Sequence, residues 1–158
     1  MSTATTYRFQ IHALPAEVLA HSRTHRVDPT GRPVEHLLAG GGEPLRCCLS
    51  DARGGDRLVL FAHTLDLSAS PYRETGPVFA HAEACPGPAS TTSYPKDWYG
   101  RAQVLRAYDE RGRIHEATTM HDGTDPEAAI DAVLRTPGVA QVHSRNVLYG
   151  CYMFTITR

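Results

Sequence analysis

The stretch TDPEAAIDAVLRTPGVAQVHSRNVLYGCYMFTI, residues 124–156, decides the expected fold because a helix pattern runs directly into a β-hairpin pattern. Thr124 and Glu127 have the spacing of a capping box, and Pro137 and Gly138 follow the last helical position. Four apolar residues would share one face of that helix: Ala129, Ile130, Val133 and Leu134. The pattern predicts a helix over about 125–135 and a hairpin over 139–156.

A second hairpin is predicted just before the helix, in AQVLRAYDERGRIHEATTMH, residues 102–121. Two alternating runs flank a turn that ends at Gly112, and a glycine in the left-handed conformation suits such a turn. The order strand, strand, helix, strand, strand predicts an α+β fold: mainly an antiparallel sheet with two β-hairpins and the helix packed on one face.

Length and composition favour one domain over residues 1–158, in which 1–42 reads as a variable strand, helix and loop. The 16 basic and 17 acidic residues nearly cancel, so neither nucleic acid nor a membrane is expected as a partner. Residues 1–20 lack the features of a secretory signal, and no apolar run approaches the roughly 20 residues of a membrane span. These features favour a cytoplasmic protein, and homodimer formation is left open.

The direction of side chains in the last hairpin depends on its loop. A three-residue loop of 148–150 would pair odd-numbered residues with odd-numbered ones. The core face would then carry Ala140, Val142, Tyr152, Phe154 and Ile156, and the opposite face would carry Gln141, His143, Arg145, Cys151, Met153 and Thr155. A loop of two or four residues would instead place His143 beside Phe154 and Ile156, where burial of a charged group is costly. The odd loop is therefore preferred, and Asn146 is expected to cap it.

The sequence contains four blocks rich in polar residues: PLRCCLSDA (44–52), SPYRETGPVF (70–79), LRAYDERGRI (105–114) and VHSRNVLYGCY (142–152). Together they resemble the signature blocks of a bacterial family known as domain of unknown function family 1203. The resemblance implies that residues 43–158 form the family core. Because this family has no established activity, the resemblance implies no particular reaction.

Polar residues within these blocks are the candidates for substrate binding. Arg46, Arg73 and Arg145 lie on three separate segments, and if these converge they could hold a carboxylate or phosphate by bidentate hydrogen bonds. The alternative for each arginine is a solvated charge or a structural ion pair. Tyr72 could clamp a ligand, or it could lock its loop against the sheet.

Two further residues are candidates for catalysis. His143 could act as a general acid or base because imidazole titrates near neutral pH, or it could be a hydrogen-bonded strand histidine. Cys151 could be a thiolate nucleophile activated by Arg145 or His143, or a small buried residue with an inert thiol. Arg46, Arg73, His143 and Arg145 are expected to line one concave surface.

Metal chemistry is the main rival to this interpretation, and no metal or cofactor is expected. The four cysteines have no C-x-x-C spacing, and adjacent Cys47 and Cys48 would point to opposite faces of a strand. His21 and His25 share a helical face, but such a pair alone is weak evidence for a metal.

Two classes of function remain. The first is a small cytoplasmic enzyme that acts on an anionic metabolite by acid/base chemistry at a His/Arg site without a metal. The second is a non-catalytic domain that binds a small acid or a protein partner through the same basic pocket. Both classes need the arginines, so the sequence does not separate them.

Overall fold

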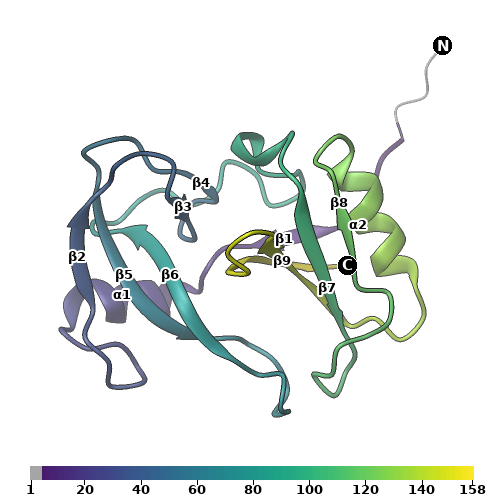
Figure 1. Cartoon of the computed structure of the whole chain (residues 1–158), viewed down its shortest axis with the longest axis horizontal. Helices are drawn as coiled ribbons and strands as arrows, with labels where there is room; N and C mark the ends of the chain where they lie inside the picture. The colour runs from purple at the N-terminus through teal and green to yellow at the C-terminus, as the bar shows by residue number, and fades with distance from the viewer. Residues whose placement is uncertain (1–4) are drawn as a thin grey trace.

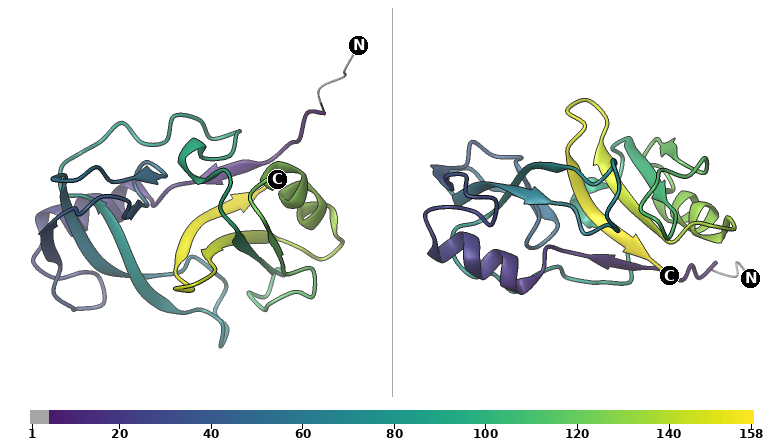
Figure 2. Two further views of the ribbon diagram at one scale, coloured as in Figure 1. Left: turned by 45° about the horizontal axis from the view of Figure 1, so that its top comes forward. Right: turned by 90° about the horizontal axis from the view of Figure 1, so that it is seen from below.

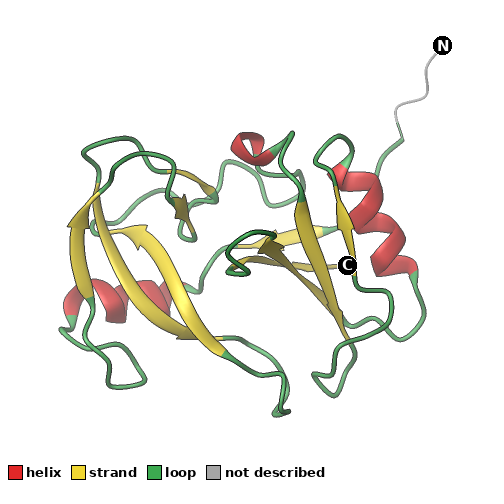
Figure 3. Cartoon of the chain, viewed as in Figure 1, coloured by secondary structure: helices red, strands yellow, loops and turns green. Residues whose placement is uncertain are grey.

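The structure, a computed structural model, describes residues 5–158. Its strands form two five-stranded sheets (Figures 1 and 3). The first sheet has the order β1 (Gln10–His12), β10 (Tyr152–Thr157), β9 (Gln141–Asn146), β7 (Gln103–Tyr108) and β8 (Thr119–His121). The second has the order β2 (Glu35–Leu38), β5 (Arg57–Thr64), β6 (Thr75–His81), β3 (Pro44–Leu45) and β4 (Ser50–Asp51). Neighbouring strands are antiparallel except β3 and β6, and the α+β prediction is confirmed.

Helix α2 (Pro126–Arg135) packs on the first sheet, as the sequence predicts (Figure 1). Its apolar face buries Ile130, Val133 and Leu134 against strands β7 and β9. The predicted cap is shifted by one residue, because the Asp125 side chain accepts the hydrogen bond from the Ala128 N–H at 3.1 Å. Proline in the first turn lacks an N–H donor, so it suits a position where that donor would have no helical partner.

The second sheet is built around the long β5–β6 hairpin, whose register runs from Leu58 opposite His81 to Thr64 opposite Thr75. Helix α1 (Ala16–Thr24) contacts β5, and its buried Leu19 joins the core of this sheet. The strands of residues 35–81 were not predicted to form a sheet of their own. Short β3 and β4 are held by pairing to β6 and to each other, contacts that sequence periodicity does not report.

The N-terminal segment contributes one strand to each sheet. Strand β1 pairs with β10 at the edge of the first sheet, and β2 pairs with β5 at the edge of the second. Figure 2 shows β1 leading from the first sheet to α1, which lies against the second sheet. Residues 10–38 therefore connect the two sheets.

The β9–β10 hairpin has the predicted register at its base, although its tip differs from the prediction in two ways that compensate each other. The Asn146 N–H donates to the Cys151 carbonyl, so the loop is one residue longer than predicted and comprises 147–150. A β-bulge at Met153 then restores the pairing of Thr155 with His143. The bulge exchanges two side chains: Met153 joins the core with Phe154, whereas Tyr152 moves to the face of His143. The predicted placements of Tyr152 on the core face and of Met153 on the face of His143 are therefore both wrong.

The polar face of this hairpin is not open to solvent. Leu65 and Leu67, from the segment between β5 and β6, form a small cluster with Tyr108 and Tyr152 on the side of β9 that carries His143. His143 and Arg145 share the predicted face, but this second layer buries both of them.

Candidate functional site

A pocket of about 430 Å³ lies between the two sheets and is the candidate functional site. We call it the inter-sheet pocket. Its walls include β3 and β6 of the second sheet and β7, β9 and β10 of the first. The apolar residues at its wall include Pro77, Phe79 and Met153. The residues with polar groups there are Glu43, Arg46, Arg101, Gln103, Asn146, Tyr149 and Cys151. Its volume falls within the range of small-molecule sites.

Arg46 is the distinctive residue of the inter-sheet pocket. It follows β3, and its side chain is 2% exposed. The Nε atom donates to the Tyr152 carbonyl at 2.8 Å, and an Nη1 hydrogen bond reaches the Pro44 carbonyl. Burial lowers the pKa of Arg46 to about 10, so the guanidinium remains charged at neutral pH.

No carboxylate of residues 5–158 forms an ion pair with Arg46. Glu43, which also lines the pocket, accepts hydrogen bonds from the N–H groups of Gly40 and Gly41 instead. A buried cation without a counter-ion is costly, and carbonyl dipoles offset only part of that cost. An anionic ligand in the pocket would supply the missing charge.

Arg101, the second cation of the pocket, already has a partner. Its two terminal nitrogens donate to the two carboxylate oxygens of Asp51 at 3.2 and 2.5 Å. These hydrogen bonds raise the pKa of Arg101. The Trp98 indole N–H also donates to Asp51, at 2.9 Å, which fixes the carboxylate. Arg101 therefore contributes hydrogen-bonding groups without adding an uncompensated charge.

Cys151 is the one cysteine among the residues that line the pocket. It follows the hairpin loop, is half-buried, and lines the inter-sheet pocket together with Arg46. Asn146 positions this loop: its side-chain oxygen accepts from the Tyr149 N–H at 2.9 Å, and its carbonyl accepts from the Gly150 N–H at 3.0 Å. The predicted capping role of Asn146 is confirmed, and the same residue also faces the pocket.

A smaller pocket of about 220 Å³ adjoins the first one and shares Pro77, Tyr149 and Cys151 with it. Arg145 lines this second pocket and is 8% exposed. Its Nη1 atom forms an ion pair with Glu74, and its Nε donates to the Gly150 carbonyl at 2.9 Å. Arg145 is therefore a compensated structural cation that secures the hairpin loop.

His143 lies outside both pockets and is fully buried. Its ring packs against Tyr108 and Tyr152, with centroids 4.8 and 5.1 Å apart, and Nε2 lies 3.1 Å from Gln141 Oε1. Burial, with the charges of Arg145 and Arg106, lowers the pKa of His143 to about 3. The expectation that His143 lines a concave surface with the arginines is wrong, because a second layer covers its face of the sheet.

Tyr72 and Arg73 are exposed on the loop before β6 and line neither pocket. The Arg73 Nε donates to the Leu65 carbonyl at 3.3 Å, which ties the loop to the end of β5. The structure thus brings Arg46 together with Cys151, places Arg145 next to them, and leaves Tyr72 and Arg73 apart. It adds Arg101 and Gln103, which lie outside the four polar blocks, and Asn146, which the sequence predicted only as a loop cap.

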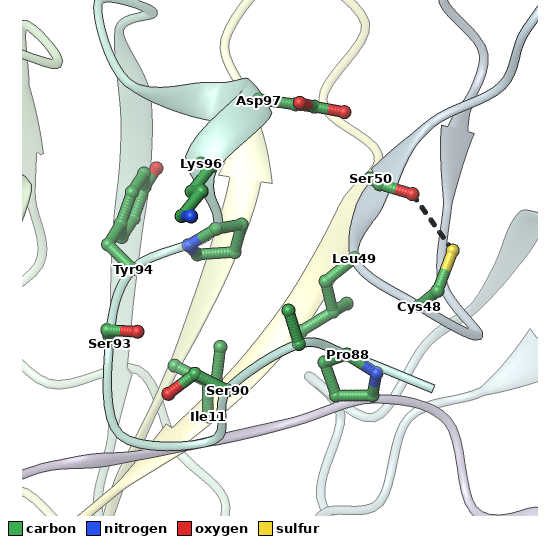
Figure 4. Close-up of a pocket in the computed structure, with 12 residues that line it drawn as sticks. Ile11, Cys48, Leu49, Ser50, Pro88, Ser90, Ser93, Tyr94, Lys96 and Asp97 are labelled. Carbon is green, nitrogen blue, oxygen red and sulfur yellow. Dashed lines mark hydrogen bonds between the residues drawn. The ribbon is translucent and has the colours of Figure 1, made fainter. Parts of the chain in front are cut away.

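A third cavity, of about 220 Å³, lies between the loop of residues 88–97 and the turn after β3 (Figure 4). Its polar rim includes Cys48, whose Sγ lies 2.9 Å from Ser50 Oγ. None of the residues predicted to bind or transform a substrate lines it.

Cys47 and Cys48 occupy a turn between β3 and β4, where adjacent side chains need not alternate as they do on a strand. Their sulfur atoms lie close to each other and to the donor atoms of His81 and Cys85. The prediction that the two cysteines point to opposite faces is therefore wrong.

A model of the family of proteins of unknown function DUF1203 matches residues 42–158. The chain belongs to this family, and all four sequence blocks fall within the matched residues. No curated protein and no solved structure matches the chain. Among the helices of residues 5–158, none combines the length and apolar character that a membrane span requires.

Proposed function

We propose that the protein binds a small anionic metabolite in the inter-sheet pocket, with Arg46 as the anchor for its carboxylate or phosphate group. The observation that carries the proposal is the buried Arg46 guanidinium, which has carbonyl partners but no ion-pair partner in residues 5–158. Charge-assisted hydrogen bonds from a buried guanidinium to a carboxylate are strong because little water competes for them.

The other walls of the pocket narrow the ligand class. Pro77, Phe79 and Met153 offer apolar contact, whereas Gln103 and Asn146 offer amide groups. A small organic acid with an apolar body and one or two further polar groups would match this lining. The compensated charge of Arg101 can orient such a ligand through its remaining N–H donors.

An enzymatic role is the second candidate, and the position of Cys151 favours it. A half-buried free thiol at the wall of an anion-binding pocket is the type of group that acts as a nucleophile in covalent catalysis. His143 is not assigned the proton transfer, because it is buried away from the pocket. A protein that only binds the acid would use Cys151 as part of the wall.

Alkylation of Cys151 tests the proposal without knowledge of the natural ligand. Iodoacetate carries a carboxylate, whereas iodoacetamide is a neutral reagent of the same size that alkylates the same thiol. We expect the ratio of the iodoacetate rate to the iodoacetamide rate at Cys151 to be at least about tenfold higher in the folded chain than in the urea-unfolded chain. Peptide mass spectrometry distinguishes Cys151 from the other cysteines.

The controls use two arginines. Arg46→Met should return the rate ratio to the unfolded value, whereas Arg73→Met, at an exposed arginine outside the pocket, should leave it unchanged. Benzoate, an acid with an apolar body, should slow iodoacetate at Cys151 in the wild type, which tests the site even if Arg46→Met does not fold. Equal ratios in folded and unfolded wild-type protein, with no effect of benzoate, would refute the proposal.

A further inference from the structure

Four metal-ligating side chains meet at one end of the second sheet, outside the inter-sheet pocket. They are Cys47 and Cys48 in the turn after β3, His81 at the end of β6, and Cys85 in the following loop. One donor atom from each lies within 4.8 Å of all the others. Pairing of β3 with β6, Leu45 opposite Phe79, brings the turn and the strand end together.

The spacing of these donor atoms suits a tetrahedral ion. Zinc binds thiolate sulfur at about 2.3 Å and imidazole nitrogen at about 2.0 Å, so donors at the corners of such a site are roughly 3.5–3.8 Å apart. The His81 Nδ1 atom lies 3.5 Å from Cys47 Sγ and 3.9 Å from Cys48 Sγ. All three cysteines are free thiols rather than disulfides. Only small movements would bring the four donors onto one ion.

Groups around the four residues support the same interpretation. The other ring nitrogen of His81, Nε2, lies 3.6 Å from an Asp56 carboxylate oxygen, so Nδ1 is the atom that faces the sulfurs. A carboxylate behind a histidine in this way orients the ring and raises its basicity in metal sites. The His81 backbone N–H donates to Cys47 Sγ at 3.3 Å, and Ser50 Oγ lies 2.9 Å from Cys48 Sγ. Both are donors suited to thiolates.

We propose that Cys47, Cys48, Cys85 and His81 bind one zinc ion in a closed structural site. Three sulfurs and one imidazole nitrogen fill a tetrahedron, which leaves no position for a substrate and separates this site from a catalytic zinc centre. Cys47 is buried, whereas the other three residues are partly exposed, so an ion can enter from one side.

The zinc site would fix two parts of the fold that have little regular structure. The loop after β6 carries Cys85 and continues into the wall of the cavity in Figure 4. The turn that carries Cys47 and Cys48 also carries Arg46 as the residue immediately before them. Zinc would therefore hold both the loop and the anchor residue of the inter-sheet pocket, but its binding does not depend on the proposed function of that pocket.

The full chain, expressed without a histidine tag and purified in a phosphine reductant without chelators, provides the test. Elemental analysis should find one zinc ion per chain in the wild type. Cys85→Ser should lose it, whereas Cys151→Ser, which removes a cysteine outside the cluster, should retain it. Asp56→Ala should retain the site with an affinity that is about 10–100-fold lower, because the carboxylate acts through His81.

Anaerobic titration of metal-free wild-type protein with Co²⁺ gives a second measurement that needs no variant. Cobalt in a tetrahedral thiolate site should produce intense visible ligand-field bands and a sulfur-to-cobalt charge-transfer band, and Zn²⁺ should displace both. Absence of these bands and of copurified zinc in the wild type would overturn the proposal. Equal zinc content in well-folded Cys85→Ser protein would also overturn it.

Discussion

The Nε atom of Arg46 donates a hydrogen bond to the backbone carbonyl of Tyr152 at 2.8 Å and so connects the two sheets. Arg46 follows β3 of the second sheet, and Tyr152 begins β10 of the first. The bulge at Met153 lies next to the accepting carbonyl. One buried side chain therefore has two tasks, because it joins the sheets and supplies the uncompensated charge of the inter-sheet pocket.

Replacement of Arg46 by methionine should destabilise the fold as well as remove anion binding. The Tyr152 and Pro44 carbonyls would lose their donor, and each unsatisfied buried group costs about 1–3 kcal/mol. We expect urea denaturation to show that Arg46→Met lowers the free energy of unfolding by about 2–4 kcal/mol. Arg73→Met should change the free energy of unfolding by less than about 0.5 kcal/mol. Equal decreases in the two variants would contradict a stabilising hydrogen bond from Arg46 to Tyr152 between the sheets.

Glu74 should be needed to compensate the buried Arg145. Its carboxylate forms ion pairs with both Arg145 and Arg106. We expect Glu74→Gln to lower the free energy of unfolding by about 1–3 kcal/mol, because it leaves Arg145 without an acidic partner. The matched control is Glu83→Gln, since the Glu83 pair with Arg57 is exposed and such pairs contribute about 0–1 kcal/mol. Similar effects of the two changes would show that Glu74 is not the main partner.

His143 should make stability depend on pH. Its pKa is about 3 in the folded protein, against the model-compound value of 6.5, so the unfolded chain takes up a proton that the folded chain excludes. The contribution of His143 to the free energy of unfolding is fully present above pH 6.5. It falls as the pH decreases from 6.5 towards 3, by up to about 1.4 kcal/mol per pH unit.

The variant His143→Gln isolates this effect. The difference in free energy of unfolding between wild type and variant should be constant above pH 6.5 and should decrease steadily below it. Urea denaturation at a series of pH values measures this difference, and the subtraction removes contributions from groups that do not interact with His143, such as His121. A difference that does not change with pH would mean that His143 is accessible to protons in the folded state.

Gly112 and Gly150 should respond differently to alanine although both have a φ of +73°. A Cβ atom at Gly112 would lie 2.5 Å from the Ser68 carbonyl oxygen, whereas a Cβ atom at Gly150 would meet nothing within 4 Å. Gly150→Ala should lower the free energy of unfolding by about 1–2 kcal/mol, because alanine is strained in the left-handed conformation. Gly112→Ala should lower the free energy of unfolding by at least about 1 kcal/mol more than Gly150→Ala, because its Cβ atom would also clash with Ser68. Thermal unfolding compares the stability of the two variants directly. Equal decreases in stability would contradict the close approach of Gly112 to Ser68.

Sequence patterns predicted the helix and the two antiparallel strand pairs of the second half of the chain, but after Gly112 only Thr119–His121 forms a strand before the helix. The helix of 126–135 has its own periodicity, and Gly112 takes a conformation that glycine tolerates best. The register at His143 was also predicted correctly, but through a loop one residue too short and without the bulge at Met153. The two differences cancel at the hairpin base and leave Tyr152 and Met153 on the faces opposite to those predicted.

The candidate site was harder to predict because it depends on contacts between distant segments. Arg46 and Cys151 meet across two sheets, and no local pattern reports that meeting. The sequence predicts which side of the sheet carries His143, but it does not predict that Leu65 and Leu67 cover this side. On a strand, Cys47 and Cys48 would point to opposite faces, but they lie in a turn, which allows both to face His81.

The pairing of β1 with β10 and of β2 with β5 has a consequence for any attempt to produce the family-matched part alone. A chain begun at residue 42 would expose backbone groups at residues 155–157 of β10 and 57–60 of β5, and unpaired strand edges of this kind promote association between molecules. The match to the family starts at residue 42, but a chain that keeps both edge strands must start no later than residue 10.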